Sequence, residues 1–127
     1  MVITMGSMTG AGKDAVDEAR ARGVRVGLIK LRFYRPFPAK RLAAALAGKK
    51  AFCVVDRSVC FGWNRGPMYM ETVSAVAELC PGLARFSAIG GLGGADISVE
   101  DFTQIIDRLE KTKDSAGEQE SLWLFHE

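Results

Sequence analysis

The sequence predicts an α/β fold, in which the strands of one sheet alternate with helices along the chain. Short apolar runs of strand length alternate with segments of helical periodicity. Glycine or proline stands at most of the junctions, as at Gly23, Gly48 and Pro81. The 127 residues are enough for one domain, and the apolar fraction of 48% is typical of a globular protein with a real core.

The first half of the chain predicts two strands and two helices. Residues 2–5 form an apolar run that Gly6 closes, and residues 11–22 show a helical pattern that Gly23 ends. Residues 24–33 are apolar on both faces, which is typical of a central parallel strand. Pro36 and Pro38 end this strand because they lack backbone donors, and a helix is expected from Pro38 to residue 46 or 47.

The second half predicts strands at residues 51–55 and 86–89 and a helix at residues 69–79. Ser98, followed three residues later by Asp101, is expected to cap a helix with one apolar stripe. Residues 112–119 are polar, and residues 122–125 are too apolar for a free tail. A fifth strand is expected either at residues 122–125 or upstream of Met1. We therefore expect a domain at residues 1–112, followed by a polar linker and an apolar segment at residues 113–127.

Charge and cysteine content exclude several classes of function. The net charge is +2 with scattered basic residues, which does not favour binding to nucleic acid or to an anionic membrane. No apolar run approaches the roughly 20 residues that span a bilayer, and the start of the chain is not a signal peptide. Cys53, Cys60 and Cys80 with the single His126 cannot supply an iron–sulfur cluster or a zinc site, and they suit a reducing cytoplasm.

Two catalytic motifs are suggested by the sequence and then rejected by their spacing. The glycines between Gly6 and Gly12 do not have the P-loop spacing, and Asp14 follows Lys13 where a magnesium-binding hydroxyl is required. Ser58 lacks the sequence of a nucleophile elbow, and His126 lies near the chain end. The sequence therefore predicts no catalytic, cofactor-binding or metal-binding residue.

Three loops with distinctive residues follow predicted strands, so they should meet at the carboxyl edge of the sheet, where ligands of such folds bind. Arg35 is expected to be a clamp or an anion ligand, and Asp56 and Arg57 to pair with each other or to contact a partner. Trp63 lies in a glycine-rich loop and is expected to contact another chain, while the glycine cluster suggests positive φ or close approach. The full set of interface or anion-contact candidates is Arg35, Asp56, Arg57, Gly62, Trp63, Gly66, Gly91, Gly93 and Gly94.

Four segments together resemble the α chains of pyruvate (2-oxoacid):ferredoxin oxidoreductases, over residues 2–111. They are the strand end at residues 5–7, the strand and turn that end in Arg35-Pro36-Phe37-Pro38, the strand and loop at residues 54–69, and the loop at residues 89–97. The family often has Arg where this chain has Ala95, which puts an anion or interdomain contact at that position in doubt.

The resemblance implies a transketolase C-terminal-like domain: a three-layer α/β/α sandwich with a mostly parallel, mixed sheet that includes one antiparallel strand. It also implies a structural role in an enzyme that converts a 2-oxoacid, such as pyruvate, and coenzyme A to acyl-coenzyme A and CO₂. Such enzymes use thiamine diphosphate, Mg²⁺ and iron–sulfur clusters held elsewhere, and reduce ferredoxin. The partners implied are the other domains or subunits, and the chain is expected to be a fragment, inactive in isolation.

Two alternatives stay open at the level of the sequence. One is a regulatory module that binds an anion such as a coenzyme A phosphate at Arg35, Arg57 and the glycine-rich loop. The other is an independent α/β enzyme of unrelated chemistry. The identity of the 2-oxoacid cannot be predicted from this chain.

Overall fold

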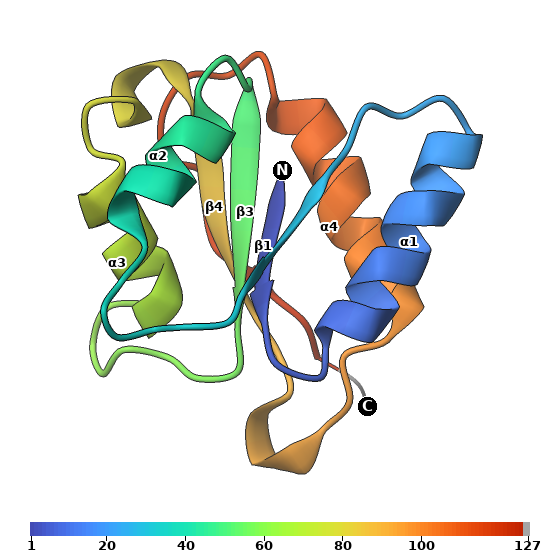
Figure 1. Cartoon of the computed structure of the whole chain (residues 1–127). Coiled ribbons are helices and arrows are strands. Elements are labelled where there is room, and N and C mark those ends of the chain that lie inside the picture. Colours follow the sequence, from blue (N-terminus) through green and yellow to red (C-terminus); the bar gives the residue numbers. More distant parts are fainter. Residues whose placement is uncertain (126–127) are drawn as a thin grey trace.

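The computed structural model describes residues 1–125 and contains one sheet of five strands in the order β2-β1-β3-β4-β5 (Figure 1). The strands are β1 (Val2–Met5), β2 (Leu28–Leu31), β3 (Ala51–Asp56), β4 (Ala84–Ile89) and β5 (Leu122–Trp123). Each neighbouring pair is parallel. All carboxyl ends of the strands therefore lie at one edge of the sheet, the lower edge in Figure 1.

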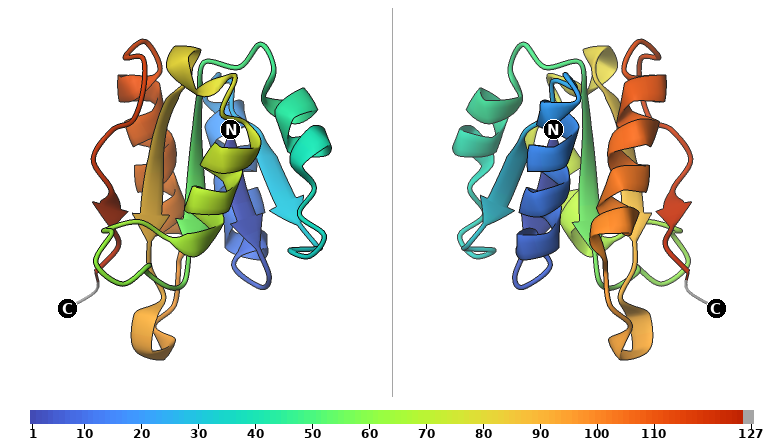
Figure 2. Two further views of the ribbon diagram at one scale, coloured as in Figure 1. Left: turned by 90° about the vertical axis from the view of Figure 1, so that its left-hand side faces the viewer. Right: turned by 90° about the vertical axis from the view of Figure 1, so that its right-hand side faces the viewer.

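Two helices cover each face of the sheet, which makes three layers (Figures 1 and 2). Helices α1 (Thr9–Ala21) and α4 (Val99–Thr112) lie on one face, and α2 (Ala39–Leu46) and α3 (Pro67–Ala75) lie on the other. Short 3₁₀ turns at Cys80–Gly82 and Leu92–Gly94 precede and follow β4. No helix among residues 1–125 is long and apolar enough to cross a membrane.

The central strand β3 divides its side chains between two cores. Cys53 and Val55 pack with α1 and α4, whereas Phe52 and Val54 pack with α2 and α3. This alternation follows from the two-residue period of a strand, and all six residues of β3 are buried. A continuous apolar run is what a strand covered on both faces requires.

The predicted α/β sandwich is confirmed, with two differences. The resemblance implied one antiparallel strand, but β5 also runs parallel to β4, because α4 carries the chain back to the amino edge before β5 begins. The strand predicted as central, residues 24–33, is an edge strand of four residues, and its Lys30 is exposed. Val24, Val26 and Leu28 instead pack with the core beneath α1 and α4, and Ile29 packs with the core on the other face.

The local signal for the start of α4 was reliable, whereas the helix predicted at residues 69–79 runs from Pro67 to Ala75 and ends before the predicted stop. The Ser98 hydroxyl accepts a hydrogen bond from the Asp101 amide at 3.2 Å, and the Asp101 carboxylate accepts one from the Ser98 amide at 2.7 Å. The predicted capping box is thus confirmed. Helix α1 begins at Thr9, so Gly10, Gly12 and Lys13 lie inside a helix rather than in a phosphate-binding loop.

Candidate functional site at the carboxyl edge

Large apolar side chains are exposed at one edge of the molecule. Phe33 (72% exposed) follows β2, Phe61 (102%) and Trp63 (65%) follow β3, Leu92 (39%) follows β4, and Phe125 (75%) follows β5. Val59, in the loop after β3, completes the set of exposed large hydrophobic residues within residues 1–125. All six lie in the loops at the carboxyl ends of strands (Figure 2), and we call this surface the carboxyl edge. Such a concentration marks an interaction site more often than a solvated surface.

Asp56 holds the loop after β3 from inside the protein. Its side chain, 4% exposed, accepts hydrogen bonds from the Met68 amide at 2.9 Å and the Tyr69 amide at 3.0 Å. These amides belong to the first turn of α3, whose N-cap, Gly66, has no side chain to accept them. Asp56 therefore caps α3 from a neighbouring strand, and the predicted ion pair with Arg57 is wrong.

Gly66 is required by the same contact. Its φ of −79° suits any residue, but a Cβ there would overlap the Asp56 carboxylate. Burial raises the pKa of Asp56 to about 6, and the two amide hydrogen bonds oppose this rise without cancelling it. The capping carboxylate is therefore poised to take up a proton in mildly acidic solution.

Arg57 fastens the glycine-rich loop that follows β4. Its Nη2 donates to the carbonyl oxygen of Ala95 at 3.0 Å, and a Cβ at Gly91 would lie 2.8 Å from its Nε. Gly91, Gly93 and Gly94 have φ values of +69°, +65° and +85°, as the prediction of positive φ required. The loop projects beyond the other strand ends (Figure 1).

Arg35 lies at the surface, where its guanidinium is engaged by groups of the same chain. Its Nη2 donates to Glu71 Oε1 on α3 at 2.6 Å, and its guanidinium lies 4.4 Å from the centre of the Tyr34 ring. The interaction with Glu71 raises the pKa of this guanidinium further. The contact joins the loop after β2 to α3, which agrees with a structural clamp.

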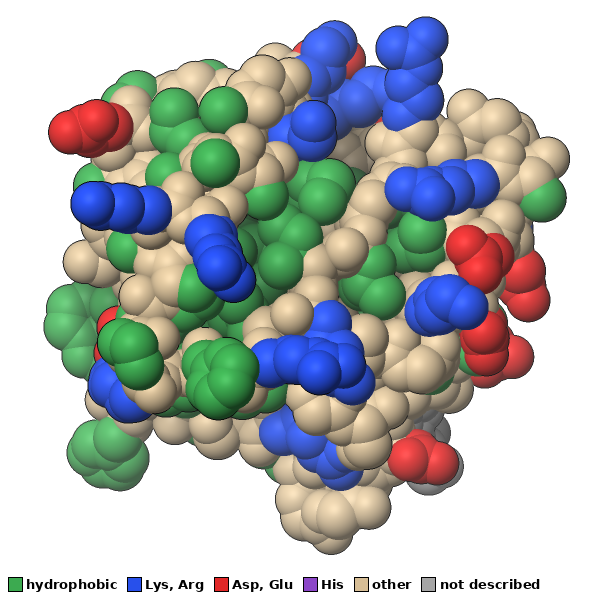
Figure 3. Space-filling model, viewed as in Figure 1, with side chains coloured by type: hydrophobic (Ala, Val, Ile, Leu, Met, Phe, Trp, Pro, Cys, Tyr) green, Lys and Arg blue, Asp and Glu red, His purple; other side chains and the backbone are tan. Residues whose placement is uncertain are grey.

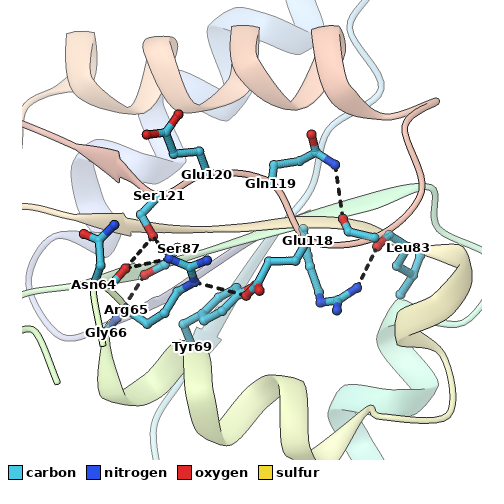
Figure 4. A network of polar contacts seen from close by, with 12 residues as sticks. Asn64, Arg65, Gly66, Tyr69, Leu83, Ser87, Glu118, Gln119, Glu120 and Ser121 are labelled. Atoms are coloured by element: carbon cyan, nitrogen blue, oxygen red, sulfur yellow. Dashed lines mark hydrogen bonds and ion pairs between the residues drawn. The ribbon is translucent and has the colours of Figure 1, made fainter. Parts of the chain in front are cut away.

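A polar network fixes the loop after β3 to the C-terminal segment (Figure 4). Arg65 Nε donates to Glu118 Oε1 at 3.1 Å, and the Tyr69 hydroxyl donates to the same oxygen at 2.6 Å. The Arg65 ion pair lowers the pKa of Glu118. Trp123 Nε1 donates to Asn64 Oδ1 at 2.7 Å, next to Gly62 and Trp63 in the chain. Residues 113–125 thus contact the domain along β4 and the β3–α3 loop.

Sequence patterns predicted the loops of the carboxyl edge but not most of their exposed apolar residues. Trp63 was singled out and Phe125 was noted only as part of the apolar segment at residues 122–125, whereas Phe33, Val59, Phe61 and Leu92 were not identified. Each of these residues lies within or beside a turn that follows a strand, where no core can cover it. This position in the sequence could have identified them as exposed. Tyr69, in the first turn of α3, is fully buried and belongs to the core.

The described residues do not fit an iron–sulfur cluster. Cys53 lies in the core beneath α1 and α4, and Cys80 lies in the core on the opposite face of the sheet. Burial raises the pKa of both thiols, which disfavours the thiolate that a cluster requires. Within residues 1–125 no three His, Cys, Asp or Glu side chains gather in a way that could hold a metal ion. His126 lies outside the described residues.

Comparison with known proteins identifies the family to which this chain is related. The chain is 48% identical over 124 residues to the α subunit of an NADH-dependent phenylglyoxylate dehydrogenase from Aromatoleum evansii, covering 97% of this chain and 30% of that subunit. It is 35% identical over 127 residues to pyruvate synthase subunit PorA of Methanosarcina barkeri, covering 98% of this chain and 31% of the relative. Ketoisovalerate oxidoreductase subunit VorA of Pyrococcus furiosus is 35% identical over 120 residues, covering 94% of this chain and 30% of the relative.

The chain thus spans about three-tenths of the length of these curated relatives. The family model for pyruvate:ferredoxin oxidoreductase core domain II matches residues 1–102, from β1 into the first turn of α4. That range includes the loops that follow β1, β2, β3 and β4. The chain belongs to the pyruvate:ferredoxin oxidoreductase core domain II family.

Proposed function

We propose that this chain is the interface domain of a 2-oxoacid oxidoreductase α subunit and does no chemistry by itself. The carboxyl edge carries the proposal, because its exposed apolar side chains require a covering surface. Relatives whose names specify phenylglyoxylate, pyruvate or ketoisovalerate share this region. We infer that the choice among 2-oxoacids is made outside it.

The complete enzyme is proposed to convert a 2-oxoacid and coenzyme A to acyl-coenzyme A and CO₂ in the cytoplasm and to reduce ferredoxin. Thiamine diphosphate, Mg²⁺ and iron–sulfur clusters would supply the chemistry of decarboxylation and electron transfer in other domains or subunits. The part played by this chain is to present a preformed surface to them. The loop after β3 is held by bonds to α3 and β5, and the loop after β4 is held by Arg57, the first residue after β3.

An anion-binding regulatory module is the competing function. Its two predicted ligands, Arg35 and Arg57, both bond within the chain, to Glu71 and to the Ala95 carbonyl. This engagement favours the interface over the anion site. Titration with coenzyme A while thermal unfolding is followed separates the two, because a saturable rise of several degrees in Tm would support the module.

The first test is the size of the native protein, by immunoblot of the source cells with an antibody against this chain. A band well above 13.8 kDa that co-purifies with 2-oxoacid oxidoreductase activity is expected. A band at 13.8 kDa without such partners would contradict the proposal.

The second test uses surface variants of the native complex. Phe61→Ser and Trp63→Ser should leave the Tm of the isolated chain unchanged, because both side chains are exposed, and should weaken retention of the partner subunits. Gln104→Ala, at an exposed position of α4, is the matched control and should assemble normally. Unchanged assembly of both aromatic variants would exclude the carboxyl edge as the docking surface.

A further inference from the structure

A large cleft lies at the opposite, amino edge of the sheet. Its volume is about 1050 Å³, and it opens between the start of β1, the loop before β2, the loop before β3 and the end of α4. We call it the amino-edge cleft. It is lined by Met1, Arg20, residues 23–28, residues 48–51, Ile106, Leu109, Glu110 and Lys113.

The cleft combines an apolar floor with a basic rim. Met1, Val24 and Leu28 contribute to the floor, with further apolar side chains from β3 and α4. Five cationic side chains line it, and Glu110 is its one acidic lining residue. Figure 3 shows Lys and Arg side chains gathered above hydrophobic ones at this end of the molecule.

Part of this positive charge is not neutralised within the described chain. Lys113 pairs with Glu110 at 2.9 Å and Lys50 with Asp114 at 3.1 Å. The side chains of Arg25 and Lys49 make no hydrogen bond or ion pair with any residue of the described range 1–125. Arg25 and Lys49 are both exposed, so carboxylates or other anionic groups of an occupant can reach them and would complement their charge.

The apolar lining favours a polypeptide over a small anion. Met1, Val24 and Leu28 offer contacts to apolar side chains, which a small anion lacks. A polypeptide can supply apolar side chains for this floor and carboxylates for the basic rim at the same time.

We propose that the amino-edge cleft receives an acidic, apolar polypeptide segment from the part of the α subunit that lies outside this chain. The inference rests on the proposed function, in which the chain is one domain of a longer subunit. The relatives provide room for such a segment, since about seven-tenths of their length lies outside the matched region. The domain would then be held at both edges of its sheet, by aromatic contacts at one and by charge at the other.

Carbodiimide cross-linking of the native complex tests this placement, because it joins a lysine amine directly to a carboxylate that contacts it. Peptide mass spectrometry is expected to show Lys49 or Lys50 linked to an Asp or Glu outside residues 1–127. Lys111, exposed on α4 and not part of the cleft lining, is the control and should show no such link. Links confined to Glu110 or Asp114 would overturn the proposal.

Acetylation and substitution provide an independent readout. Lys49 should be acetylated at least tenfold more slowly in the complex than in the isolated chain, and Lys49→Glu should reduce assembly while Lys111→Glu does not. Equal acetylation rates would overturn the proposal. Protection of Lys49 from acetylation that disappears after gel filtration, in a complex that shows no cross-link, would indicate a bound small anion. That result would also overturn the proposal.

The two proposals fail in distinguishable ways. A full-size, active complex with a freely reactive Lys49 would exclude the cleft segment and leave the interface function standing. A native protein of 13.8 kDa would exclude the function itself.

Discussion

Protonation of Asp56 should stabilise this domain, in contrast to the usual effect of acid on a protein. Burial raises the pKa of this carboxyl from 3.8 to about 6 in the folded state. The folded protein therefore binds the proton more tightly than the unfolded chain, and the free energy of unfolding rises as the pH falls through 6. Between pH 8 and pH 5 the expected gain from this group is about 1.4 kcal/mol, taking ~1.36 kcal/mol for each pKa unit.

Urea denaturation at a series of pH values measures the effect when the wild type is compared with Asp56→Asn. The asparagine cannot ionise, so the stability difference between the two proteins isolates this carboxyl from all other titrating groups. The free energy of unfolding of the wild type, relative to that of the variant, should rise by about 1.4 kcal/mol as the pH falls from 8 to 5. Asp96→Asn removes the same charge from an exposed position in the loop after β4, and its pH profile should parallel that of the wild type.

Two results would refute the reasoning. A pH-independent difference would mean that the Asp56 carboxyl has the same pKa in the folded and unfolded states. A wild type that loses stability relative to Asp56→Asn on acidification would mean that the two α3 amides outweigh burial and lower the pKa.

Three further substitutions test contacts described above, each by urea denaturation at pH 7. Gly66→Ala should destabilise the chain by about 1–3 kcal/mol, because the new Cβ overlaps the Asp56 side chain; an unchanged midpoint would contradict the close approach. Ser98→Ala should cost about 1 kcal/mol through loss of the capping box with Asp101, and a neutral result would show that the carboxylate alone suffices. Glu118→Gln should cost about 1 kcal/mol by weakening two charged hydrogen bonds at one oxygen, and a stabilised variant would show that the network is strained.

Local patterns predicted most of the fold because the determinants of these elements are themselves local. The continuous apolar run of β3 and the Ser98 capping box needed no knowledge of distant residues. The position of β2 at the sheet edge could not be predicted in this way, since strand order depends on how the helical connections pack. The apolar pattern of residues 24–33 therefore led to the wrong place in the sheet.

The site was harder to predict because its contacts join residues far apart in sequence. Asp56 reaches amides twelve and thirteen residues away, and Glu118 reaches Arg65 across 53 positions. An acidic residue next to an arginine suggested an ion pair, but the capping amides of α3 took the carboxylate instead. Trp63 was identified because a glycine-rich loop surrounds it, whereas Phe61 in the same loop and Phe33 after β2 were missed.

The hydrogen bonds that hold the loops of the carboxyl edge affect the rate at which a partner associates. The bond from Trp123 to Asn64 and the bond from Arg57 to Ala95 restrict the two most prominent loops before any partner arrives. Little ordering remains for the encounter, so association should be limited by orientation and not by loop rearrangement. Substitutions that remove one of these hydrogen bonds without changing a residue that contacts the partner are expected to slow association. Loss of an aromatic contact residue should mainly speed dissociation.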